Sequence, residues 1–169
     1  MARVFQIPGV LTSVYTSAVV PLGTTYEKDS GQAFMFLYNA GADSTAAGDV
    51  TGVYDSTGTT FGYVSVTAAT LLDYTDGTTI RVLVAGIAMA TVATTQYGWF
   101  WFRGYGTDTI TTDGTAVKAQ GLVCADGLKV ATTNATAGTA HQSLFGVAYA
   151  DDVSTSLNKA NLFCNAWGG

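Results

Sequence analysis

Charged residues are scarce in this sequence. Of its 169 residues, 12 are acidic and 7 are basic, so the charged fraction is 11%, against roughly 25% in an average soluble domain. Long amphipathic helices need solvent faces rich in Glu, Lys and Arg, which this chain cannot supply. Nucleic-acid binding needs clustered cations, whereas the net charge is −5 and the cations are scattered singly. The sequence therefore predicts neither long helices nor a nucleic-acid partner.

Side chains suited to catalysis or metal binding are also scarce. The chain has one His (His141) and one Glu (Glu27), and most of its 11 Asp residues lie beside Gly, Ser or Thr in predicted turns. Ser143 is only two residues from His141, and no nucleophile-elbow motif is present. No His or Cys pair has the spacing of zinc ligands, and the glycines at 104 and 106 lack the third glycine of a dinucleotide-binding motif. We therefore expect no enzyme activity, catalytic residue, cofactor or metal site.

The cysteines and the apolar runs argue against two further classes of protein, disulfide-stabilised domains and proteins with membrane-spanning helices. Cys124 and Cys164 lie in apolar, strand-like stretches, which predicts buried thiols rather than a disulfide framework. The longest fully apolar run is nine residues, 82–90, whereas a membrane-spanning helix needs about 20. We expect no contact with a membrane.

Small residues and turn signals dominate what is present. Thr (27), Ala (24) and Gly (20) make up 71 of the 169 residues, and 48% of the chain is hydrophobic. Asp-Gly pairs at 76–77, 113–114 and 126–127 favour tight turns, and β-branched and aromatic runs lie between the turns. The predicted strands span residues 33–38, 50–54, 61–67, 80–92, 97–103, 116–118, 121–125, 128–131, 144–150 and 160–167.

These elements predict an all-β fold. We expect a compact antiparallel β-sandwich or β-barrel with short turns and at most one short helix, for which 67–74 is the candidate. Residues 1–30 are predicted to form an extended, contact-making N-terminal arm, and residues 31–169 a single β domain. The pattern Gly-aliphatic-Ala-x-Ala occurs at 86–90 and again at 146–150, which suggests a pseudo-repeat of about 80–103 and 144–167.

The predicted strand 97–103 is apolar on both faces. Alternation places Trp99 and Trp101 on one side and Phe100 and Phe102 on the other, so both sides must be covered. One interpretation is a central strand between two layers of the same chain. The other is that one face lies at a subunit interface, where aromatic residues are enriched. The low charge favours the second, which makes Trp99 and Trp101 interface candidates.

Several segments resemble tailed-bacteriophage capsid decoration (head cement) proteins. The resemblance is carried by residues 47–50, 86–90, 114–123 and 144–150, and it extends over about 33–167. It implies a small β-rich protein, often a homotrimer, on the outer capsid at junctions between major capsid protein subunits. It implies a structural virion protein, made in the host cytoplasm, whose partners are the major capsid protein and its own copies, and which has no active site.

The predicted arm and the C-terminal strand supply the remaining interface candidates. They are Phe5, Ile7, Val10, Phe163 and Trp167. Two alternatives stay open: a tail or fibre component of a virion, and a carbohydrate-binding β module. In the latter, Trp99, Trp101 or Tyr105 would stack on sugar rings.

Overall fold

The computed structural model describes residues 10–41, 44–53, 63–65, 84–112, 118–125, 129–132, 145–150 and 156–164. These residues form twelve strands and contain no helix, so the predicted all-β class is confirmed. The predicted helical turn at 67–74 lies outside the described residues. The strands are β1 (Thr25–Glu27), β2 (Ala33–Asn39), β3 (Val50–Val53), β4 (Tyr63–Ser65), β5 (Val84–Ala88), β6 (Tyr97–Gly106), β7 (Ile110–Thr111), β8 (Gly121–Ala125), β9 (Lys129–Thr132), β10 (Gly146–Ala148), β11 (Ser156–Leu157) and β12 (Ala160–Phe163).

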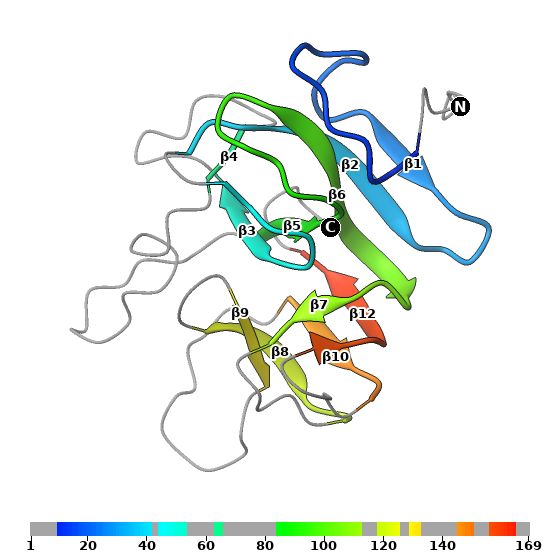
Figure 1. Cartoon of the computed structure of the whole chain (residues 1–169). Coiled ribbons are helices and arrows are strands. Elements are labelled where there is room, and N and C mark those ends of the chain that lie inside the picture. Colours follow the sequence, from blue (N-terminus) through cyan, green and yellow to red (C-terminus); the bar gives the residue numbers. More distant parts are fainter. Residues whose placement is uncertain are drawn as a thin grey trace.

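Ten of the strands form one sheet (Figure 1). Their order is β1-β2-β4-β3-β5-β6-β12-β10-β8-β9, with β2 also paired to β6, while β7 and β11 form a separate pair. Among the described pairings only β2–β4 is parallel. The sheet is not closed into a barrel, so the architecture agrees with the sandwich-like alternative.

Strand β6 lies at the centre, and its residues 98–101 are buried on both faces. Trp99 and Trp101 belong to a large apolar cluster, and Phe100 belongs to a second one, which we call the inner cluster. All three side chains are at most 2% exposed. The inner cluster consists of Met35, Leu37, Val64, Ala85, Ala88, Val92 and Phe100. Residues of the same chain therefore cover both faces of this part of the strand, as expected for a central strand between two layers of one chain.

The N-terminal segment packs on the same sheet. Tyr15 forms a β-bridge with Tyr97, with both backbone N–O distances 2.9 Å, and β1 pairs with β2. Within that pairing Glu27 lies opposite Ala33, so strand β1 of the predicted arm extends the sheet of the β domain. Residues 1–9 of the predicted arm lie outside the described residues.

Two parts of the sheet are built alike. The first unit comprises β2 to β5 with the first half of β6, and the second unit comprises the second half of β6 with β8, β9, β10 and β12. Their strand orders, β4-β3-β5-β6 and β9-β8-β10-β12, match. Their registers match at these pairs: Thr51↔Gly86 and Leu122↔Gly146; Ala88↔Phe100 and Ala148↔Ala160; Phe34↔Trp101 and Tyr105↔Asn161. The match ends at a register shift between Ala33 and Phe34, which the β6–β12 pairing lacks.

The turns that lead into β3 and β8 share a backbone geometry. Gly48 (φ 91°) and Ala119 (φ 66°) both adopt the left-handed conformation, which is costly for alanine. Each turn exchanges two backbone hydrogen bonds with the end of the neighbouring strand. The bonds are Gly48 N to Ala88 O (2.8 Å), Ala88 N to Asp49 O (2.9 Å), Ala119 N to Ala148 O (2.8 Å) and Ala148 N to Gln120 O (2.9 Å). The match therefore extends beyond strand order to individual bonds.

The glycine of the repeated sequence pattern also has one role in both units. A Cβ on Gly86 would lie 2.8 Å from the Trp101 carbonyl oxygen, and a Cβ on Gly146 would lie 2.9 Å from that of Asn161. In each case the adjacent strand approaches too closely for a side chain. The pattern at 86–90 and 146–150 thus marks equivalent strands, β5 and β10.

The bend in β6 where the first unit passes into the second allows a stability test. Gly104 has φ 87°, and a Cβ there would overlap the carbonyl oxygen of Gly31. We expect Gly104→Ala to lower the free energy of unfolding by roughly 2–4 kcal/mol, from left-handed strain and overpacking together. Gly31→Ala is the matched control, because Gly31 has φ 82° but no atom within 4 Å of its Cβ position.

The control should lose only about 1–2 kcal/mol, the cost of the left-handed backbone alone. Urea denaturation of both variants measures the difference. Equal losses of unfolding free energy in the two variants would show that Gly31 does not approach Gly104 closely enough to exclude a Cβ at residue 104.

Candidate functional site

An exposed group of aromatic side chains lies on the second unit. Tyr105 on β6, Tyr149 after β10 and Phe163 on β12 are 41%, 48% and 47% exposed. We call these three residues the aromatic face. The rings of Tyr105 and Tyr149 meet edge to face, with centroids 5.6 Å apart and planes at 86°.

The β6–β12 register places the aromatic face on one side of the sheet. Arg103 lies opposite Phe163, and Tyr105 lies opposite Asn161, so each pair projects to the same side. The Arg103 guanidinium forms an ion pair with Glu27 at 3.2 Å, and both side chains are more than half exposed. The result is an aromatic centre with a polar rim, the composition of protein-docking surfaces.

The predicted interface residues fall into three groups. Phe163 and Val10 are exposed, at 47% and 67%. Phe5, Ile7 and Trp167 lie outside the described residues. Trp99 and Trp101 were also predicted as interface candidates, but the structure buries both in the core of the chain.

Both tryptophans are core residues of the single chain. Trp99 is 2% and Trp101 0% exposed, and the indole N–H of Trp101 donates to the Arg103 carbonyl oxygen at 3.1 Å. Strand alternation indicated that this face must be covered, but it carried no information on which molecule covers it. The chain itself does so, and neither indole is accessible to a partner or to a sugar ring.

Tyr149 was not predicted from the sequence as a binding residue, and Tyr105 was predicted only as a sugar-stacking residue. Tyr149 follows Ala148 in the repeated pattern, at the place that Met89 takes in the first unit. The signal available in the sequence was that this position is aromatic in the second repeat (Tyr149) and not aromatic in the first (Met89). It becomes informative only once the β5 and β10 registers are known.

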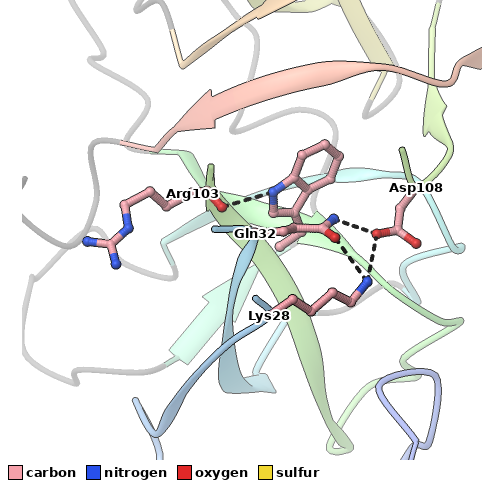
Figure 2. Close-up of polar contacts among 5 residues, drawn as sticks. Lys28, Gln32, Arg103 and Asp108 are labelled. Atoms are coloured by element: carbon pink, nitrogen blue, oxygen red, sulfur yellow. Dashed lines mark hydrogen bonds and ion pairs between the residues drawn. The ribbon is translucent and has the colours of Figure 1, made fainter. Parts of the chain in front are cut away.

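A polar cluster joins the β1–β2 turn to the chain that follows β6 (Figure 2). The Lys28 Nζ donates to Gln32 Oε1 at 2.9 Å and lies 3.6 Å from Asp108 Oδ2, which also accepts a short hydrogen bond from Gln32 Nε2. Gln32 is 3% exposed. Because each group already has a partner within the cluster, the arrangement fixes the turn rather than offering groups to a ligand.

We expect Asp108→Ala to lower the free energy of unfolding by about 1–3 kcal/mol, since it leaves the buried Gln32 amide without its acceptor. Asp108→Asn, which keeps an acceptor oxygen, should lose less. Glu27→Gln removes an exposed ion pair and should cost less than about 1 kcal/mol. Chemical denaturation ranks the three variants, and a loss for Asp108→Ala as small as that for Glu27→Gln would contradict the role of the cluster.

A shallow pocket of about 200 Å³ lies between the N-terminal segment and β5. Among its described lining residues Asp108 is the one carboxylate, so no acid–base pair faces the pocket. The lining consists of Thr12, Ala47, Gly48, Ala88, Met89, Asp108 and Thr109. Within the described part of the chain no three His, Cys, Asp or Glu side chains gather as metal ligands, and His141 lies outside it.

The described residues define an all-β protein with an exposed aromatic face on its sheet. No family model, characterised protein or solved structure matches the chain. None of the described residues belongs to a helix that could cross a membrane.

Proposed function

We propose that this chain is a structural virion protein that binds the outer capsid surface and stabilises the junctions between major capsid protein subunits. Its partners in this proposal are the major capsid protein and further copies of the chain, with which it forms a homotrimer. The protein is made in the host cytoplasm and lies on the outer surface of the virion. In this proposal it acts without a catalytic residue or a cofactor. The observation that carries the proposal is the aromatic face on a chain with only 11% charged residues.

The aromatic face supports docking to protein. Tyr and Phe are enriched at protein interfaces, where they provide much apolar contact area on few rotatable bonds. A charge-poor surface loses little hydration free energy when it is covered. A protein held at several places on a shell also gains from effective concentration, because every contact after the first is intramolecular. These properties suit a protein that reinforces an assembled shell.

A carbohydrate-binding module is the second candidate. It is favoured by the edge-to-face pair of Tyr105 and Tyr149, which leaves both rings about half accessible. Against it, the two ring planes are nearly perpendicular, at 86°, and do not form a flat platform for successive sugar rings.

Co-sedimentation with empty capsids, built from the major capsid protein encoded with this chain, tests the proposal. We expect the full chain to pellet with capsids and Tyr105→Ser/Phe163→Ser to bind at least roughly tenfold more weakly, because truncation of hot-spot aromatic residues costs about 2 kcal/mol or more. Val19→Ser is the matched control, since Val19 is 41% exposed but lies in the N-terminal segment.

The control should bind capsids like the unaltered chain. Thermal unfolding of all three proteins shows whether a loss of binding reflects a loss of folding. A full chain that stays in the supernatant but is retained on a glycan array would replace the capsid proposal with the carbohydrate one.

A further inference from the structure

Two cations lie at the ends of the aromatic face. Strand β12 alternates between buried and accessible residues, so Lys159, Asn161 and Phe163 share its accessible side. Arg103 lies opposite Phe163 in the β6–β12 register. At the other end Tyr149 donates its backbone N–H to the Lys159 carbonyl oxygen at 2.9 Å. Each end of the aromatic face therefore combines an aromatic ring with a basic side chain.

Arg103 is held in place by its own chain and still has donors to offer. Its guanidinium forms the 3.2 Å ion pair with Glu27 and lies 5.7 Å from the centre of the Phe102 ring. Both side chains of the ion pair are more than half exposed, so a third group can reach them. A guanidinium carries five N–H donors, more than one carboxylate can occupy. Arg103 is therefore a preorganised donor for a second carboxylate.

Lys159 is exposed and has no ion-pair partner within the described part of the chain. The ion pairs of the described residues are those of Lys28 with Asp108 and of Arg103 with Glu27. An ammonium group is strongly hydrated, and a surface that covers it without supplying an anion loses that hydration free energy. A neutral surface over the aromatic face is therefore disfavoured at Lys159, whereas a carboxylate there is favoured.

The basic ends of the aromatic face contrast with the charge of the whole chain. The net charge is −5, so an acidic surface repels the chain in most orientations. The cations beside the aromatic rings attract the same surface in one orientation. Charges placed in this way set the orientation and the rate of association, while the rings supply the apolar contact area.

We propose that the surface of the major capsid protein that docks on the aromatic face is acidic, with carboxylates opposite Lys159 and Arg103 around an apolar centre. This inference rests on the proposed function and specifies the chemistry of the partner in that contact. Lys159 and Phe163 are four residues apart on an extended chain, which corresponds to about 13 Å. Because Arg103 lies beside Phe163, the two carboxylates come from different side chains of the partner.

Co-sedimentation with empty capsids at two salt concentrations tests the charge of the partner surface. At about 50 mM NaCl we expect Lys159→Gln to bind roughly threefold, and Lys159→Glu roughly tenfold, more weakly than the full chain. At about 1 M NaCl the screening length is only about 3 Å, so the three proteins should bind nearly alike. Lys159→Arg keeps the charge and should bind like the full chain at both concentrations.

Two controls separate a local contact from a general effect of charge. Ser17→Glu changes the net charge by the same amount as Lys159→Gln, but on the exposed N-terminal segment, and should bind within about twofold of the full chain. Amidation of the capsid carboxylates with a water-soluble carbodiimide should weaken binding of the full chain at low salt. Thermal unfolding of each variant shows that its fold is retained.

The outcomes separate this inference from the proposed function. If Lys159→Glu binds like the full chain at low salt, the partner is not acidic there, while weaker binding of Tyr105→Ser/Phe163→Ser still supports docking to capsids. Stronger binding of Lys159→Glu would mean that the partner surface is basic. A full chain that stays in the supernatant at both salt concentrations overturns both proposals, and its retention on carboxylated but not neutral glycans would assign the cations to an acidic sugar.

Discussion

The structure depends on covering β6 on both faces. Three consecutive aromatic side chains, Trp99, Phe100 and Trp101, project alternately to its two sides, and each buries about 150–250 Å² when fully enclosed. At about 25 cal/mol per Å², each contributes roughly 4–6 kcal/mol as an upper estimate, because the unfolded chain already hides part of that area. Net stability of a domain is only about 5–15 kcal/mol, so leaving either side uncovered is not compatible with a stable fold. The inner cluster covers one side. On the other side the tryptophans share a cluster with buried residues of the second unit such as Leu122 and Leu162, and the N-terminal segment packs against that cluster.

The same requirement explains why the two units differ in sequence while sharing a backbone. Strand order, register, turn geometry and the close approach at Gly86 and Gly146 are common to both. The two units differ in the side chains on the outer face of the sheet, which are the ones that would need a cover. Lys159 and Asn161 stand where the first unit has tryptophans, and they lower the apolar area that must be hidden. The outer face of the second unit is therefore stable in water, although the outer face of the first is not.

Much of the fold followed from pattern alone, whereas the identity of the covering segments did not. A run of apolar and aromatic residues correctly indicated a strand at 33–38. Alternation over 97–103 indicated burial on both sides, which the structure shows for 98–101 but not for Arg103. It could not show that the cover over Trp99 and Trp101 is intramolecular, because period-two burial looks the same whichever chain supplies the contact. Strand β1 was missed since it has three residues and no apolar run, and it forms because β2 offers it an edge.

The candidate site was harder to predict because its signal is a difference between equivalent positions. Phe163 was identified as an interface residue from its place in an aromatic C-terminal strand, and its exposure is compatible with that role. Tyr105 and Tyr149 gain meaning only beside Phe34 and Met89, their equivalents in the first unit. The low charge of the chain at first served only to exclude long helices and nucleic-acid binding. In this comparison it corresponds to a particular surface, the aromatic face. The N-terminal segment packs against the outer face of the first unit, whereas Tyr105, Tyr149 and Phe163 of the second unit stay partly exposed among the described residues.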